Sequence, residues 1–152
     1  MSSARIGYVN ILSDDIERQA AFYSELLGFP ELVGHRSPIY RCLDGNGVEM
    51  GFNAPKAYEL LGIVDRRPAQ RPAPVTSFFT IEVEAEALVD HAAARAGALG
   101  GRVLKQPYVT YYNGWQCVLE DPEGNVFRVN HRRGARTPFD ELPDAARVPI
   151  ES

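Results

Sequence analysis

The stretch "GYVNILSDDIERQAAFYSELLGF", Gly7 to Phe29, decides the fold because it joins a strand pattern directly to a helix pattern. Residues 5–12 have strand character, and Asp14 followed three residues later by Glu17 is a capping-box signal for a helix start. Apolar residues then recur at helical spacing, and Gly28 stands where a helix C-cap glycine belongs. We therefore predict a strand that leads into an amphipathic helix with one face in the core.

The same order of elements is predicted twice along the chain. The first helix is followed by strand candidates at residues 31–33, 37–43 and 48–53, the last two separated by the turn sequence "DGNG". After a short amphipathic helix at 57–63 and a proline-rich stretch, the order restarts with a strand at 75–83, a helix at 85–98, and strands at 102–104, 108–112, 115–119 and 126–130.

An internal duplication explains this order better than two unrelated halves do. The segments "LDGNGVEM" and "EDPEGNVFRV" each place a turn before a strand at the end of a unit. We predict an α+β fold of two βαβββ modules forming curved sheets around a cleft, within one structural domain. The first module spans residues 1–53, a short helix and linker span 54–74, the second module spans 75–130, and a C-terminal tail spans 131–152.

Composition and charge narrow the classes of function. The chain has 152 residues, of which 45% are hydrophobic and 24% charged, as in an ordinary globular domain. A net charge of -4 argues against nucleic-acid binding. The apolar runs are too short for a membrane span, and Cys42 and Cys117 lack metal-type spacing. A cytoplasmic protein without nucleic-acid or membrane partners is expected.

Two motifs carry a resemblance to a known family. "DDIERQAAFYSELLGF" and "EDPEGNVFRV", separated by "FFTIEVEAEALVDHAAARAG", resemble the vicinal oxygen chelate superfamily, which includes glyoxalase I, extradiol dioxygenases, fosfomycin-resistance enzymes and bleomycin-resistance proteins. The resemblance covers about residues 5 to 130. It implies paired βαβββ modules around a cleft. In the enzymes it also implies a divalent metal, held in each module by a first-strand His or Gln and a last-strand Glu.

The four metal-binding positions implied by the resemblance fall on Tyr8, Glu49, Phe78 and Arg128. Phenylalanine cannot coordinate a metal, a neutral tyrosine is a poor ligand, and a guanidinium repels a cation. Only Glu49 remains, whereas a catalytic metal normally needs three protein ligands. We therefore predict no metal and no cofactor.

The three histidines offer no replacement at the level of sequence. His35, His91 and His131 form no close-spaced pair with one another or with a cysteine. We interpret all three as ordinary surface or partly buried histidines.

The predicted cleft strands and the loop "YYNGW" are rich in aromatic residues, which offer flat surfaces to a planar ligand. Alternating aromatics on strands are also typical of a core, so the loop residues are the better candidates. The predicted ligand-binding residues are Tyr8, Glu49, Phe52, Phe78, Tyr111, Tyr112, Trp115 and Arg128.

Glu49 and Arg128 carry a hypothesis of their own, because they occupy equivalent points in the two modules. Their charges replace the lost metal, either by pairing with each other or by binding a polar ligand. Whether one cleft is formed within one chain or between two chains stays open.

Three functions remain. The first is a metal-independent binding protein for a small aromatic or polar organic ligand, such as an antibiotic or natural product. By resemblance to bleomycin-resistance proteins, it would be a homodimer with clefts at the subunit interface. The alternative is a lyase, isomerase or dioxygenase of the same fold, with a non-standard metal site or with Tyr8 and Glu49 as metal-free acid and base. The third is a structural or regulatory module whose own aromatics fill the cleft.

Overall fold

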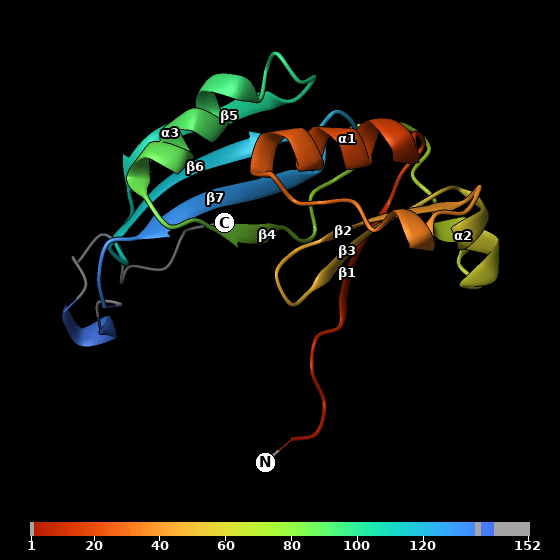
Figure 1. Cartoon of the computed structure of the whole chain (residues 1–152), viewed down its shortest axis with the longest axis horizontal. Helices are drawn as coiled ribbons and strands as arrows, with labels where there is room; N and C mark the ends of the chain where they lie inside the picture. Colours follow the sequence, from red (N-terminus) through yellow and green to blue (C-terminus); the bar gives the residue numbers. More distant parts are fainter. Residues whose placement is uncertain (1, 136–137, 142–152) are drawn as a thin grey trace.

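The computed structural model describes residues 2–135 and 138–141, and it confirms an α+β fold built from two βαβββ-type modules (Figure 1). The first module forms a three-stranded sheet in the order β1-β3-β2, with β1 parallel to β3 and β2 antiparallel to it. Its elements, with the helix that follows them, are β1 (Tyr8–Leu12), α1 (Ile16–Leu27), β2 (Tyr40–Asp44), β3 (Glu49–Asn53) and α2 (Lys56–Leu60).

The second module forms a four-stranded sheet in the order β4-β7-β6-β5, in which β4 runs parallel to β7. Its elements are β4 (Phe79–Glu82), α3 (Glu86–Arg95), β5 (Arg102–Val109), β6 (Gly114–Glu120) and β7 (Val126–Arg132). Short 3₁₀ turns lie at η1 (Val33–His35), η2 (Val64–Arg66) and η3 (Phe139–Glu141). Helices α1 and α3 lie on the same side of the two sheets and leave the other side open (Figure 1).

Two of the predicted strands differ in the structure. The strand predicted at 31–33 is reduced to an isolated bridge between Glu31 and Leu43, because the backbone turns into η1 instead of pairing onward. The strands predicted at 102–104 and 108–112 are one strand, β5, with shifts in register on either side of Lys105. Pro107 lacks a backbone N–H, so an irregular ladder is expected there.

The N-cap of α1 is Asp15, one residue after the predicted Asp14. The Asp15 side chain accepts a hydrogen bond from the backbone N of Arg18 at 3.1 Å. Asp14 is engaged elsewhere, because its carboxylate receives Arg71 Nε at 2.8 Å. The predicted C-cap at Gly28 is present, with φ of 75° in the left-handed region that favours glycine.

A cluster of aromatic rings joins the two modules in one core. Tyr23 of α1 stacks on Phe52 of β3 with 5.5 Å between ring centroids, and it also packs on Phe127 of β7 at 5.0 Å. Phe127 in turn stacks on Phe79 of β4 at 5.7 Å. Helix α1 therefore covers the seam between the two sheets, so the modules share one hydrophobic core.

A buried carboxylate beside this cluster fixes the same seam. Asp121, 2% exposed, accepts hydrogen bonds from Tyr23 Oη at 2.7 Å and Gln19 Nε2 at 2.8 Å. Its other oxygen accepts from the backbone N of Glu123 at 2.9 Å and of Asn125 at 3.0 Å, which closes the turn before β7. One side chain of the second module thus holds both its own turn and the first module's helix.

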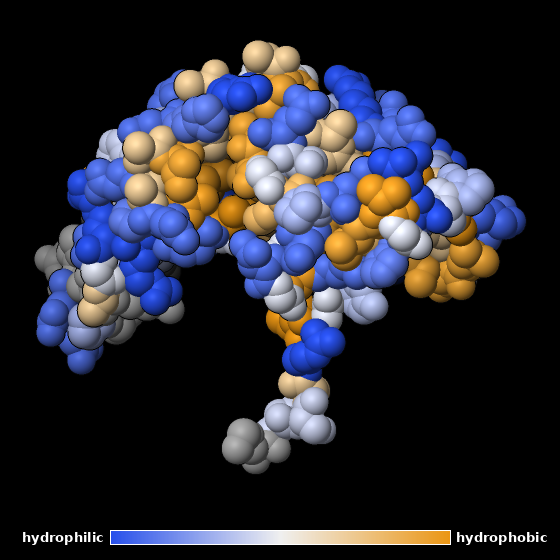
Figure 2. Space-filling view, viewed as in Figure 1, coloured by the Kyte–Doolittle hydropathy of each residue, from blue (hydrophilic) through white to orange (hydrophobic). Residues whose placement is uncertain are grey.

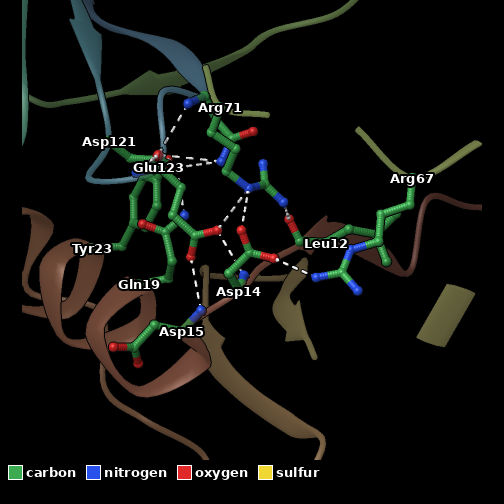
Figure 3. A network of polar contacts seen from close by, with 10 residues as sticks. Leu12, Asp14, Asp15, Gln19, Tyr23, Arg67, Arg71, Asp121 and Glu123 are labelled. Carbon is green, nitrogen blue, oxygen red and sulfur yellow. Dashed lines mark hydrogen bonds and ion pairs between the residues drawn. The ribbon is translucent and has the colours of Figure 1, made fainter. Parts of the chain in front are cut away.

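The linker is tied to the same place (Figure 3). Arg71 Nε lies 2.8 Å from Asp14 Oδ2 and 3.2 Å from Glu123 Oε1, and its Nη2 donates to the carbonyl of Leu12 at 3.2 Å. Glu123 also accepts the backbone N–H groups of Asp14 at 2.7 Å and Asp15 at 3.1 Å. The linker, the start of α1 and the turn before β7 are therefore joined by charge-assisted hydrogen bonds.

No helix in the described part of the chain combines the length and the apolar character that crossing a membrane requires. Residues 136–137 and 142–152 of the predicted tail lie outside the described residues. Within the described part, β7 continues through His131 to Arg132, so the last strand passes the predicted end of the second module at residue 130.

We expect Tyr23→Phe to lower the free energy of unfolding by about 2 kcal/mol, because it removes a hydrogen bond to a buried carboxylate. Tyr58→Phe is the matched control: Tyr58 is 5% exposed, and its hydroxyl has no hydrogen-bond partner within the described residues. Urea unfolding of both variants measures the difference. Equal losses in the two variants would contradict a special role for the Asp121 contact.

A pH dependence follows from the Asp14 contact. The hydrogen bond from Arg71 lowers the pKa of Asp14, so its charge stabilises the folded protein above the ordinary aspartate pKa of about 3.9. This contribution is lost as pH falls through the lowered folded-state pKa. Because Asp14 is 49% exposed, we expect Asp14→Asn to cost under about 1 kcal/mol at pH 7. The cost should shrink in urea unfolding below about pH 4, and a cost independent of pH would contradict this account.

Candidate functional site

The open faces of the two sheets, on the side away from the helices, form the candidate site. Phe79 and Ile81 of β4 pack against the core, so Thr80 between them points the other way. Phe78, just before β4, lies on the same side as Thr80, against Arg128. In β3, Met50 and Phe52 are buried in the core, which turns Glu49 to the open face. The space-filling view shows the molecule hollowed on this side (Figure 2).

On the second sheet, Arg128 of β7 is the centre of a compact group. Its Nε donates to Thr80 Oγ1 at 2.9 Å and its Nη1 donates to the Tyr112 hydroxyl at 3.0 Å. The guanidinium carbon lies 4.8 Å from the Phe78 ring centroid and 5.9 Å from that of Tyr112. We call Phe78, Thr80, Tyr112 and Arg128 the second-sheet site. No carboxylate within residues 2–135 and 138–141 forms an ion pair with Arg128, although Glu82 lines the same hollow.

A chain of hydrogen bonds orients the Tyr112 ring. The Tyr112 hydroxyl donates to Gln116 Oε1, and Gln116 Nε2 donates to the Tyr108 hydroxyl at 2.9 Å. Gln116 is 1% exposed, so this chain is anchored in the interior of the sheet. Because its hydroxyl both donates to Gln116 and accepts from Arg128, Tyr112 stands as a fixed wall of the site.

A hollow of about 430 Å³ lies beside Arg128, a size that suits a small organic molecule. Its lining includes Glu82 and Asn130, whose side chains are joined by an Asn130 Nδ2 to Glu82 Oε2 hydrogen bond of 2.7 Å. Asn130 is 6% exposed, and its Oδ1 has no hydrogen-bond partner among the described residues. A Cβ at Gly114 would lie 2.3 Å from this oxygen, so only glycine leaves that acceptor room. The hollow thus combines the Arg128 cation with the Glu82 carboxylate and the Asn130 amide.

On the first sheet, Glu49 is the corresponding polar residue. Its Oε2 accepts a hydrogen bond from the Tyr40 hydroxyl at 3.1 Å, and its Oε1 lies 3.2 Å from His35 Nδ1. Burial, together with Cys42 and Glu49, raises the pKa of Tyr40, so its hydroxyl keeps the proton that it donates. Tyr8 pairs with Glu49 across the parallel ladder and is 61% exposed, but the two side chains share no hydrogen bond in the described structure.

Glu49 and Arg128 do not pair within one chain. Glu49 contacts Tyr40 and His35, whereas Arg128 contacts Thr80 and Tyr112, with no ion pair between the two in the described part. One form of the predicted hypothesis, direct pairing, is therefore not realised in the single chain.

The donor set at the four positions implied by the resemblance does not suit a metal. Glu49 is the only good ligand of the four, and the described residues bring no group of three His, Cys, Asp or Glu side chains together on the second sheet. The Arg128 charge on the second sheet opposes a cation there. A metal bridging the two modules at these positions therefore does not fit the residues present.

Two of the predicted ligand residues lie on the helix side of their sheets, away from the open faces. Phe52 is 0% exposed and stacks on Tyr23, so it belongs to the core. Trp115 lies beneath α3, where its Nε1 donates to Asp90 Oδ1 at 2.8 Å. Both are on the helix side of their sheets, and the prediction that they line the cleft is wrong. Tyr111, 55% exposed, stands edge-on to Tyr112 and does line the hollow.

Sequence reasoning missed Tyr40, Thr80, Glu82 and Asn130. Thr80 and Glu82 alternate with the core residues of β4, and Asn130 comes two residues after Arg128 on β7. This period of two is a usable signal once the strand ends are placed. The spacing of His35 and Cys42 in the sequence is not that of a metal motif, so the pattern alone does not bring them together.

A model of the glyoxalase-like domain family matches residues 8–130. Among solved structures, the chain is similar to a glyoxalase/bleomycin resistance protein/dioxygenase family enzyme from Burkholderia phytofirmans PsJN, at 40% identity and a TM-score of 0.79, over 85% of this chain and 99% of that chain.

More distant matches share the fold. A glyoxalase-related enzyme from Fulvimarina pelagi is 22% identical, with a TM-score of 0.70 over 84% of this chain and 87% of that chain. A glyoxalase/bleomycin resistance protein/dioxygenase from Nocardioides is 21% identical, with a TM-score of 0.71 over 91% and 90%. The comparison with curated proteins gave no match.

Proposed function

The chain belongs to the glyoxalase/bleomycin-resistance/dioxygenase superfamily, and from this premise we propose that it is a small-molecule binding protein. Its ligand is a planar aromatic compound with an anionic group, held on the second-sheet site. Binding uses no metal at the four positions implied by the resemblance. The observation that carries the proposal is Arg128 between the rings of Phe78 and Tyr112, without an ion-pair partner among the described residues.

The geometry of Arg128 supports an anion as the ligand's polar group. Its Nε and Nη1 are used by Thr80 and Tyr112, which fixes the plane of the guanidinium. Its Nη2 has no partner in the described structure, and a carboxylate or phenolate would accept from it. The rings of Phe78 and Tyr112 offer apolar surface beside that contact for the ligand's aromatic part.

Glu49 gives limited support to the enzyme alternative. Its carboxylate is 18% exposed and already engaged by Tyr40 and His35, and Tyr8 does not contact it as an acid partner. Binding without turnover is therefore the function that the contacts support better. Analysis of recovered ligand by mass spectrometry distinguishes the two, since an enzyme would return altered ligand.

A homodimer is part of the proposal. Segment 2–7 extends away from the body of the molecule (Figure 1), and its Ile6 is 73% exposed. Tyr8, Phe78 and Tyr111 are also more than half exposed, and Tyr8 and Phe78 lie on the open faces of the sheets. A second copy would cover these side chains and close the hollow over a ligand.

Replacing Arg128 with Ala should weaken binding of naphthoate, a planar aromatic carboxylate, by about 10- to 100-fold, as expected for a hydrogen bond to a charged group. Naphthamide, its uncharged counterpart, should bind more weakly to the wild type and lose little in the variant. Isothermal titration calorimetry measures all four affinities.

Arg102→Ala is the control for general loss of positive charge, because Arg102 is 67% exposed and pairs with Glu120 at the start of β5. It should leave naphthoate affinity unchanged. Equal affinity of wild type and Arg128→Ala for naphthoate, or no preference for the carboxylate over the amide, would overturn the proposed site.

Sedimentation equilibrium tests the homodimer. We expect a mass twice that of the 16.8 kDa chain, and Ile6→Glu should shift the equilibrium toward monomer because it places a charge in the apolar contact. Leu60→Glu alters a similarly exposed side chain on α2 and should leave the dimer intact. A wild-type protein that stays monomeric at all concentrations would contradict the dimer.

A further inference from the structure

Three potential metal ligands from separate elements converge on the first sheet. His35 comes from η1, Cys42 from β2 and Glu49 from β3, and their ligand atoms all lie within 4.8 Å of one another. His35 Nδ1 is 3.6 Å from Cys42 Sγ and 3.2 Å from Glu49 Oε1. We call these residues the His–Cys–Glu cluster, and we propose that it binds a divalent transition metal, with zinc as the best match.

The fold builds this cluster from three separate segments of the first module. Leu32 donates its backbone N–H to the carbonyl of Cys42 at 3.0 Å, which holds the beginning of η1 against β2. Cys42 lies opposite Gly51 on β3, so Glu49 is its diagonal neighbour on the same face. A Cβ at Gly51 would lie 2.6 Å from the Tyr40 hydroxyl, so the glycine leaves Tyr40 room beside Glu49.

The two distances from His35 match tetrahedral coordination, and the third pair, Cys42 and Glu49, lies within 4.8 Å. Zinc binds thiolate sulfur at about 2.3 Å and imidazole nitrogen or carboxylate oxygen at about 2.0 to 2.1 Å. Two such ligands at the tetrahedral angle stand about 3.5 Å apart for nitrogen and sulfur, and about 3.3 Å apart for nitrogen and oxygen. The observed separations of 3.6 and 3.2 Å are close to both values.

The charges of the cluster also favour a cation. The cluster holds the carboxylate of Glu49 beside a thiol and an imidazole. No Lys or Arg side chain in the described structure forms an ion pair with the cluster, and the nearby Arg36 and Arg41 pair with Glu31 and Glu17 instead. A divalent cation would supply the missing positive charge and displace the thiol proton.

A metal can reach the cluster from solvent, and Tyr40 orients one of its ligands. His35 is 56% exposed on its side chain while Cys42 is buried, so a metal can enter from the solvent side. Tyr40 donates to Glu49 Oε2 and leaves Oε1 facing His35, as an outer partner that orients a ligand does. The fourth coordination position would be taken by water.

This site differs from the positions implied by the family. It shares Glu49 with them but uses neither Tyr8 nor any residue of the second sheet, and it lies wholly within the first module. It goes beyond the proposed binding function, because Arg128 and its ligand do not take part in it.

Cobalt titration of the full-length protein, stripped with a chelator, tests the proposal. Cobalt bound to Cys42 should produce a thiolate charge-transfer band that saturates at one metal per chain and is bleached by added zinc. We expect His35→Gln and Cys42→Ser each to weaken binding at least tenfold, and Cys42→Ser to abolish the band. His91→Gln, on exposed α3, and Cys117→Ser, the other buried cysteine, are the matched controls and should behave as wild type.

His35→Gln keeps the test decisive if Cys42→Ser impairs folding, because His35 is largely exposed and circular dichroism should be unchanged. Absence of stoichiometric cobalt binding, or binding of equal strength in His35→Gln, would overturn the proposal. Naphthoate affinity measured on His35→Gln should match the wild type, so failure of the metal site and failure of the second-sheet site are separately visible.

Discussion

The buried carboxylate of Asp121 is the contact on which the rest of the arrangement depends. It accepts hydrogen bonds from Gln19 and Tyr23 of the first module while it closes the turn that leads into β7. The Tyr23 ring also stacks on Phe52 and packs on Phe127 at the seam of the sheets. Polar and apolar contacts at one place thus fix how the two modules sit, and both open faces follow from that.

The open faces of the two sheets present different functional groups. The second sheet presents Arg128 with aromatic rings and no acidic partner among the described residues, whereas the first presents Glu49 with a thiol, an imidazole and a phenol. In a site with one metal between the modules, these faces would supply similar ligands. Here the two faces differ in the groups they present, which is why the Arg128 ligand and the proposed metal are assigned to different sheets.

Much of this fold could be predicted from the sequence, because its signals are local ones. The glycine that ends α1 at Gly28 and the turn at residues 121–125 each depend on neighbouring residues in the chain. The site could be predicted only in part. Arg128 and Glu49 follow from the repeat. The face that Phe52 takes depends on strand ends that the sequence does not show, and Trp115, predicted as part of the YYNGW loop, lies in β6. The His–Cys–Glu cluster could not be found by spacing, since η1 replaces a predicted strand and carries His35 over β2. Its ligands meet through tertiary pairing of β2 with β3.

We propose that a metal binds only to the first sheet of this chain, away from the positions implied by the family. The most direct measurement is an anomalous difference map from crystals of the zinc-loaded protein. We predict one peak about 2.3 Å from Cys42 Sγ and about 2.0 Å from His35 Nδ1, with none beside Phe78 or Arg128. A peak between Tyr8 and the second sheet, or no peak near Cys42, would contradict the account.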